Sequence, residues 1–273
     1  MRTRRPVTLT AASLVAVAGA GAVGLRTLIA RQAAIARRRI GKPLGEQALD
    51  ADRVWRRKKH PGEPVELLVL GDSIAAGLGA GHRRDTLGAR LAKGIAREAG
   101  RPVRLRTAAV VGSETSALAG QIAALPAGYR PDAAVIVVGG NDVTHRVPAS
   151  RSAEQLGEVV RDLRSRGVPV VVGTCPDLGT LRAIPQPLRA LAARSSRQLA
   201  SAQAAAVHRA GGRVVALARS VGPVFAERPD EMFSVDRFHP SALGYRRTAE
   251  ALLPAVLAAL ETSGRRGGDP APG

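Results

Sequence analysis

Residues 65–74 read Val65-Glu66-Leu67-Leu68-Val69-Leu70-Gly71-Asp72-Ser73-Ile74, an apolar run that stops at a Gly-Asp-Ser turn. A run of this length and composition predicts a strand buried inside a sheet. In open α/β sheets the active-site crevice lies at the carboxyl ends of the strands. Ser73 would stand at such an end, so it is the candidate nucleophile, although Gly-Asp-Ser turns are also common where no chemistry occurs.

Apolar runs of strand length recur along the chain and alternate with longer amphipathic stretches. This alternation predicts an α/β fold in which helices cover both faces of a parallel sheet, a three-layer α/β/α domain. Strands are expected at residues 65–70, 103–107, 133–138, 168–172 and 213–216. Helices are expected at residues 86–99, 116–125, 152–166, 188–210 and 241–260. Ser152 and Gln155 have capping-box spacing, which predicts that Ser152 begins the third helix.

The net charge of +19 is concentrated near the amino terminus. Residues 1–60 carry 14 Lys and Arg against three acidic residues, which leaves an excess of only +8 for the other 213 residues. Aromatic residues make up 2% of the chain, so a stacking surface for bases is not expected. We therefore expect no nucleic-acid partner, and we expect any acyl pocket to be aliphatic.

A targeting segment is expected over residues 1–25. Three arginines near the start precede an uncharged run from Pro6 to Leu25, which is long enough for a signal peptide or a signal anchor. Basic residues follow this run as well, so the orientation in a membrane stays open. The expectation is a cell-envelope protein, membrane-anchored or secreted.

The rest of the chain divides into three expected parts. Residues 26–60 form a basic linker, with its densest cluster at 56–59, which either contacts anionic lipid or is merely solvated. Residues 61–262 form the catalytic domain, and residues 263–273 a disordered tail rich in Gly and Pro. The oligomeric state is not indicated.

Three further motifs follow predicted strands or precede the last helix. They are Gly112 in Val-Val-Gly-Ser, the sequence Gly139-Gly140-Asn141-Asp142, and Asp236-Arg237-Phe238-His239-Pro240. Together with the Gly-Asp-Ser turn they resemble the SGNH, or GDSL, hydrolase superfamily. The resemblance covers residues 65–260, and Ile74 stands where the common motif has Leu. It implies a flavodoxin-like fold with a five-stranded parallel sheet in the order 2-1-3-4-5, and a serine esterase or lipase.

The resemblance also implies a role for each motif residue. Ser73 would be the nucleophile, His239 its base and Asp236 the partner that orients the base, because a serine hydroxyl needs such activation. The backbone N–H groups of Ser73 and Gly112 and the side-chain amide of Asn141 would form the oxyanion hole.

Other functions remain as alternatives. Asp142 and His145 have the same spacing as Asp236 and His239, so they form a competing pair, although the family has its base near the C-terminus. The same site could instead transfer the acyl group to another hydroxyl, or the domain could be a non-catalytic membrane-surface binder. The acyl length and the natural substrate are not indicated.

No cofactor or metal is expected. The glycines at residues 77–81 do not directly follow a strand, as a dinucleotide-binding fingerprint would, and no phosphate-loop Lys is present. Cys175 is the only cysteine, which excludes an internal disulfide and a cysteine metal cluster. The loop after the fourth strand, residues 174–187, contains several prolines and is expected to form one wall of the substrate pocket.

Overall fold

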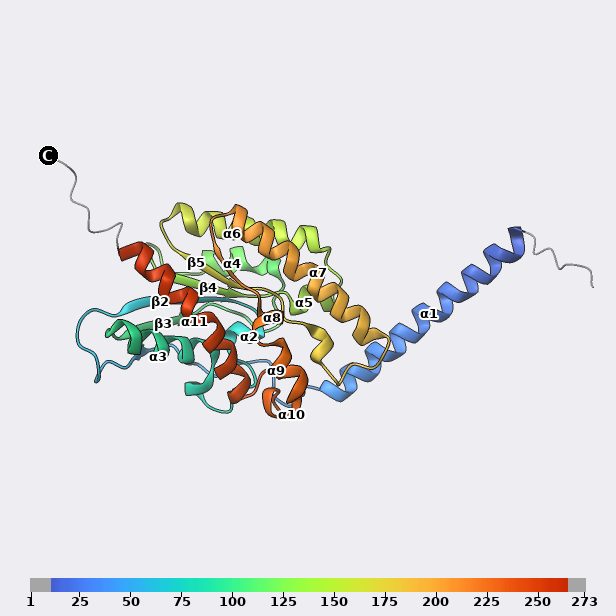
Figure 1. The fold of residues 1–273 in the computed structure, drawn as a ribbon, viewed down its shortest axis with the longest axis horizontal. Coiled ribbons are helices and arrows are strands. Elements are labelled where there is room, and N and C mark those ends of the chain that lie inside the picture. The colour runs from blue at the N-terminus through green and yellow to red at the C-terminus, as the bar shows by residue number, and fades with distance from the viewer. Residues whose placement is uncertain (1–10, 265–273) are drawn as a thin grey trace, which may run out of the picture.

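The computed structural model describes residues 11–264, with side chains from Val23 to Thr262. A central sheet has the order β1-β3-β2-β4-β5-β6, and helices lie on both of its faces (Figure 1). The strands are β1 (Val54–Trp55), β2 (Val65–Gly71), β3 (Val103–Thr107), β4 (Ala133–Val137), β5 (Val170–Gly173) and β6 (Arg213–Val215). The five strands from β2 to β6 are parallel in the expected order, and β1 adds an antiparallel sixth strand at the edge.

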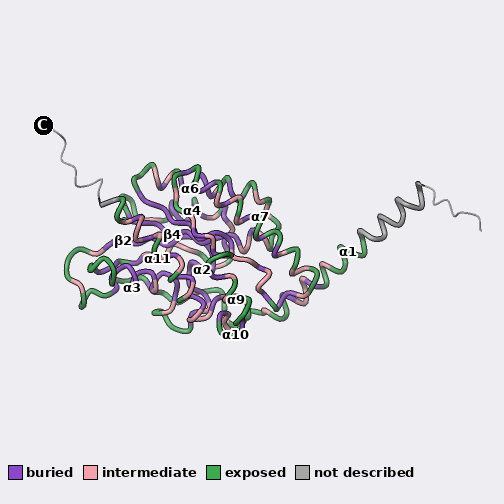
Figure 2. The backbone as a smooth tube through the Cα atoms, in the orientation of Figure 1, coloured by how far each residue is buried: buried purple, intermediate pink, exposed green. Residues whose placement is uncertain are grey.

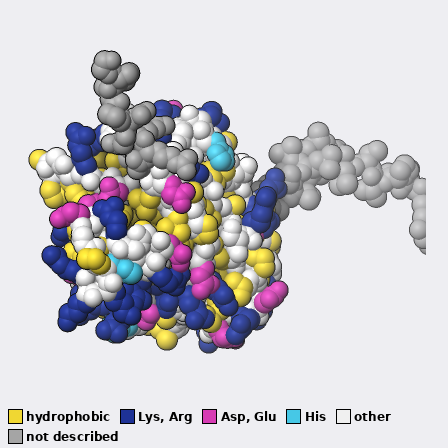
Figure 3. All heavy atoms as spheres, turned by 60° about the vertical axis from the view of Figure 1, so that its left-hand side comes forward, with side chains coloured by type: hydrophobic (Ala, Val, Ile, Leu, Met, Phe, Trp, Pro, Cys, Tyr) yellow, Lys and Arg dark blue, Asp and Glu magenta, His cyan; other side chains and the backbone are white. Residues whose placement is uncertain are grey.

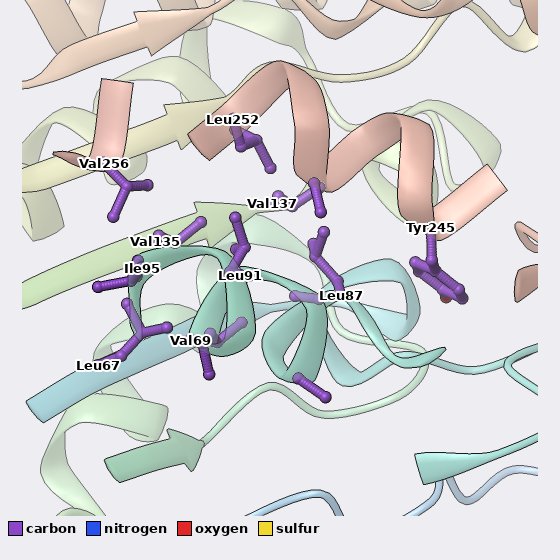
Figure 4. Close-up of a cluster of buried hydrophobic side chains, with 14 of the residues drawn as sticks. Leu67, Val69, Leu87, Leu91, Ile95, Val135, Val137, Tyr245, Leu252 and Val256 are labelled. Atoms are coloured by element: carbon purple, nitrogen blue, oxygen red, sulfur yellow. The ribbon is translucent and has the colours of Figure 1, made fainter. Parts of the chain in front are cut away.

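Strand β2 lies in the middle of the sheet because both of its faces are apolar. Leu67 and Val69 pack on one face with the helices at Leu87–Ala99 and Ala242–Gly264, as the cluster in Figure 4 shows. Leu68 and Leu70 pack on the other face with helices from Leu118–Ala123, Ala149–Ser165 and Leu188–Arg209. The four side chains have no exposed surface. Figure 2 shows the same pattern as a buried sheet inside an outer shell of exposed helix surface. Burial on both faces is typical of a parallel sheet. In this sheet Gly71, the last residue of β2, is in register with Val137 of β4.

All five expected helices are present, with ends within a few residues of the expected ranges. They are α3 (Leu87–Ala99), α4 (Leu118–Ala123), α6 (Ala149–Ser165), α7 (Leu188–Arg209) and α11 (Ala242–Gly264). The capping role expected of Ser152 is wrong, because α6 begins three residues earlier and the buried Ser152 hydroxyl bonds the Thr115 hydroxyl instead. Short helices were not expected at α2 (Ser73–Ala76), α5 (Gly140–Thr144), α8 (Leu217–Ser220), α9 (Gly222–Glu227) and α10 (Pro229–Met232).

Part of the expected linker belongs to the folded domain. Trp55 of β1 pairs with Val103 of β3, is 8% exposed, and donates its indole N–H to the Ala51 carbonyl. The Asp52 carboxylate accepts a bond from the Thr107 N–H at 2.9 Å. The segment before residue 61 therefore completes one edge of the sheet.

The basic cluster that follows β1 lies near other cations. Arg56 lines a groove together with Arg90 and Lys93 of α3 and Arg246 of α11. Burial and the neighbouring arginines lower the pKa of Lys93. Figure 3 shows Lys and Arg gathered with fewer acidic side chains over the lower part of one face. The positive charge of the domain is thus unevenly spread.

Helix α1 (Ala11–Ile40) projects away from the domain, and its described contacts with the domain come from the part between Gln32 and Ile40 (Figure 1). In the part of the chain that the structure describes, no helix has the length and apolar character needed to cross a membrane. The expected targeting segment begins before Ala11, and its first residues lie outside the described part. Residues 265–273 of the expected tail lie outside it as well.

Candidate active site

Ser73 lies directly after β2, where the backbone makes a turn that only glycine permits. Gly71 has φ +134°, and a Cβ there would lie 1.9 Å from the Val137 carbonyl oxygen. The Gln121 side-chain amide accepts a bond from the Gly71 N–H and donates one to its carbonyl, at 2.9 and 2.8 Å. Ser73 is consequently presented at the strand end by a backbone whose polar groups are paired.

Asp72 supports this turn from inside the protein. Its side chain is 2% exposed and accepts a hydrogen bond from the Ile74 N–H at 2.9 Å. Burial raises the pKa of Asp72 to about 6, and the hydrogen bonds and His239 only partly oppose this rise. The carboxyl group therefore acts as the N-cap of α2.

Asp236 and His239 come from a second turn, just before α11. His239 Nε2 lies 2.9 Å from Ser73 Oγ, and His239 Nδ1 lies 2.5 Å from Asp236 Oδ2. Because a carboxylate only accepts, Nδ1 carries the proton and Nε2 is left to accept the serine hydroxyl proton. Ser73 and His239, 166 positions apart in the sequence, thus form one continuous chain of hydrogen bonds with Asp236.

The turn itself fixes the carboxylate. Asp236 Oδ1 accepts bonds from the Phe238 and His239 N–H groups, both at 3.0 Å. Arg237, the residue directly after Asp236, has φ +56°. Burial raises the pKa of Asp236, but the bonds from His239 and Phe238 outweigh it, so the net shift is downward. The carboxylate therefore stays ionised beside the imidazole.

Of the residues expected to form the oxyanion hole, Ser73 and Asn141 line the cavity and Gly112 does not. Asn141 follows β4 at the start of α5, lines the same cavity as Ser73, and donates one amide hydrogen to the Ser113 carbonyl at 2.9 Å. Gly112 has φ +84°, which favours glycine, and a Cβ there would meet open space. It lies next to Ser113 in sequence but is outside the lining of the cavity.

The competing pair is not assembled. The Asp142 side chain is fully buried and accepts bonds from the Thr115 N–H at 3.1 and 3.3 Å. His145 Nδ1 instead lies 2.7 Å from the Glu114 carboxylate on the exposed side of the loop. Asp142 is thus a structural residue, and the His145 imidazole is paired with Glu114 instead of Asp142.

An apolar cavity of about 60 Å³ lies beside Ser73. The expectation of an aliphatic pocket is wrong, because Phe225, Phe233 and Phe238, all three phenylalanines of the chain, line it. A low aromatic content says nothing about where those few residues gather. Further lining residues are Ile74, Pro176, Asp177, Leu178, Thr180, Leu181, Leu217, Val221, Gly222, Pro240 and Thr248.

One side of the cavity comes from residues 176–188, which we call the wall loop. Pro176, Leu178 and Leu181 of this loop line the cavity, as expected from its position after β5. The loop includes a short 3-10 helix whose N-cap, Asp177, accepts a bond from the Gly179 N–H at 2.7 Å. Leu217 of α8 and Phe225 of α9 also line the cavity, and no sequence motif distinguished them from ordinary core residues.

The site has no evident metal-binding group. Within residues 11–264, no cluster of three or more His, Cys, Asp or Glu is arranged to hold a metal ion. Cys175 is a buried free thiol, and burial raises its pKa.

Comparison with known proteins agrees with this geometry. A model of the GDSL-like lipase/acylhydrolase family matches residues 69–247. A GDSL-like esterase of Mycobacterium tuberculosis is 42% identical over 269 residues, covering 95% of this chain and 85% of that protein.

Solved structures share the fold. The lipase/acylhydrolase from Enterococcus faecalis has a TM-score of 0.56 at 21% identity, over 73% of this chain and 96% of that one. TesA has a TM-score of 0.59 at 23% identity, over 71% of this chain and 99% of that one. The family model and the 42% identical relative confirm the resemblance seen in the motifs: the chain belongs to the GDSL-like lipase/acylhydrolase family.

Proposed function

We propose that the chain hydrolyses carboxylic esters with apolar acyl groups through an acyl-serine intermediate on Ser73. The observation that carries this proposal is the chain of bonds from Ser73 Oγ through the His239 ring to Asp236, at 2.9 and 2.5 Å. The activities of the esterase and lipase relatives support ester cleavage. The apolar cavity beside the serine supports an apolar acyl group.

The first step would form the acyl-enzyme. Ser73 Oγ attacks the carbonyl carbon while its proton moves to His239 Nε2, and Asp236 stabilises the resulting imidazolium. The imidazolium then protonates the leaving alcohol as the carbon–oxygen bond breaks. A water molecule, deprotonated by His239, subsequently attacks the acyl-serine and releases the carboxylic acid.

The negative oxygen formed in each step needs hydrogen-bond donors that are already in place. We assign this role to the N–H groups of Ser73 and Gly112 and to the Asn141 amide. Asn141 supports the assignment because only one of its two amide hydrogens is needed for the bond to Ser113, which leaves the other for the oxyanion.

The test uses a fluorophosphonate probe and a series of p-nitrophenyl esters on the full chain. Wild type should be labelled and should release p-nitrophenol, whereas Ser73→Ala should lose both signals. Ser116→Ala removes an exposed hydroxyl nearby and serves as the matched control. An unlabelled wild type would count against the enzyme and favour the binding-protein alternative.

Acyl transfer is the second outcome of the same chemistry, since an alcohol could replace water as acceptor. Product analysis in the presence of glycerol or a sugar distinguishes the two, because a transferase would form a new ester in preference to the free acid. We propose hydrolysis because the matching family is one of lipases and acylhydrolases and the 42% identical relative is an esterase.

We further propose that the protein works at the cell envelope. The uncharged run from Pro6 to Leu25, flanked by arginines, supports export or attachment to a membrane. Fractionation of cells expressing the full chain tests this, with a variant lacking residues 1–10 as the comparison. Equal recovery of both proteins in the cytosolic fraction would contradict it.

A further inference from the structure

The end of α1 near Ile40 lies against the wall loop, far from it in sequence (Figure 1). Gln32 is 7% exposed although its side chain is polar, which requires its amide to be hydrogen-bonded. Its Nε2 donates to the Gln186 carbonyl, and its Oε1 accepts from the Leu188 N–H at 2.9 Å. One side chain of α1 thus holds both ends of a short segment about 155 positions away.

The wall loop caps the Ala190 N–H of α7 with its own Gln186 side chain, and Gln32 supplies the partner for the Leu188 N–H. Helix α7 begins after Pro187, which provides no side-chain cap for the first N–H groups of the helix. Gln32 Oε1 takes the place of that cap at Leu188. The start of α7, and with it the end of the wall loop, is therefore fixed by a residue from another part of the chain.

An apolar contact continues from α1 to the cavity. Ala36 lies one turn after Gln32, is buried, and packs in a cluster with Leu178, Leu181 and Ile184. Leu178 and Leu181 are also lining residues of the cavity. Phe238 packs against the same cluster, and its ring meets the His239 ring edge-on at 4.9 Å.

We propose that Gln32 is a positioning residue for the substrate site: through the wall loop it sets the shape of the cavity that receives the acyl group. This proposal rests on the ester hydrolysis proposed above. Ser73, Asp236 and His239 are held by their own turns, so a loss of Gln32 alters the fit of the acyl group and leaves the hydrogen-bonded chain intact.

The kinetic test compares Gln32→Ala with Gln47→Ala, a matched loss of an exposed amide, in the full chain. For p-nitrophenyl esters from acetate to octanoate, Gln32→Ala should raise KM about five- to tenfold for the longer acyl groups. Its kcat should stay within about twofold, and the fluorophosphonate should still label Ser73. Gln47→Ala should match wild type.

A second pair of variants tests the apolar contact. Ala36→Glu places a carboxylate in the buried cluster, whereas Ala30→Glu places one on an exposed face of the same helix. Only Ala36→Glu should reproduce the rise in KM. Gln32→Glu, which keeps the acceptor for Leu188, should fall between wild type and Gln32→Ala.

Hydrogen exchange gives a readout that does not depend on activity. The Leu188 amide should exchange at least tenfold faster in Gln32→Ala than in wild type. The proposal would be overturned if Gln32→Ala left either the exchange rate of the Leu188 amide or KM unchanged. It would also be overturned if the variant only lowered kcat, in proportion to the fraction of protein that is no longer folded. If wild type cleaves none of the esters, the proposed function fails by itself, and exchange at Leu188 still decides whether Gln32 holds the loop.

Discussion

Ser73, Asp236 and His239 reach the site from two tight turns, whereas the wall loop opposite them is held by contacts from several distant elements. The Asp236–His239 turn is stabilised mainly by bonds within a few residues, such as those that Asp236 makes to the next N–H groups. The Ser73 turn combines the local Asp72 cap with two bonds from one distant side chain, Gln121. The wall loop depends on Gln32 of α1, on Ser196 of α7 and, through Arg182, on the Ala226 carbonyl. The carboxylate and the imidazole are therefore encoded locally, the serine turn only in part, and the cavity by long-range packing.

The largest expected effect comes from breaking the local side at Asp236. Asp236→Asn keeps the size of the side chain but removes the negative charge that holds the Nδ1 proton, so kcat should fall by about 10⁴-fold. The exposed Asp230→Asn is the control. Steady-state kinetics with p-nitrophenyl acetate measures kcat for both variants. A decrease of less than tenfold in Asp236→Asn would contradict the assigned role.

Asn141→Ala tests the oxyanion donor with a smaller loss. Removal of one such donor costs about 10²–10³-fold in kcat, or about 3–4 kcal/mol, with little change in KM. Loss of the bond to Ser113 accompanies it, so thermal unfolding should be recorded in parallel. If KM rises while kcat is preserved, Asn141 binds the ground state and the oxyanion assignment is wrong.

Asp72→Asn examines the buried carboxyl group through stability. Because the folded-state pKa of about 6 lies above the ordinary value of 3.8, the neutral form stabilises the fold below pH 4, and this contribution is lost as pH rises through 6. As pH rises from 4 to 8, the free energy of unfolding of the variant should increase relative to that of wild type by on the order of 2–3 kcal/mol. Urea unfolding of both proteins at pH 4 and pH 8 tests this. The prediction fails if the free energies of unfolding of variant and wild type differ by the same amount at both pH values.

The smallest effect should come from the cavity side. Phe225→Leu enlarges the apolar space, so kcat/KM should shift toward longer acyl chains by about tenfold, the scale of one or two methylene groups. Because Phe225 is not part of the hydrogen-bonded chain of Ser73, His239 and Asp236, the rate of fluorophosphonate labelling should stay within about threefold of wild type. A uniform loss across all acyl lengths would mean that Phe225 serves only the fold.

These contrasts explain how much could be predicted from the sequence. The parallel order of β2 to β6 and the meeting of Ser73 with His239 follow from strand-length apolar runs and family motifs, whose signals span a few residues each. The three phenylalanines of the cavity come from short helices and turns between residues 217 and 240, where no periodic pattern identifies a lining position. Gln32 could not be recognised either, because nothing around it indicates a partner at Leu188.

The two-residue strand β1 has a practical consequence for shortening the chain. The two residues before β1 bond to the outer edge of β3: the Arg53 carbonyl accepts from the Leu105 N–H, and the Asp52 carboxylate accepts from the Thr107 N–H. A fragment starting at residue 61 would leave these groups open to a second molecule, since bare sheet edges pair with one another. Recombinant fragments that begin before Gln32 should stay dispersed, and those that begin after Trp55 should aggregate.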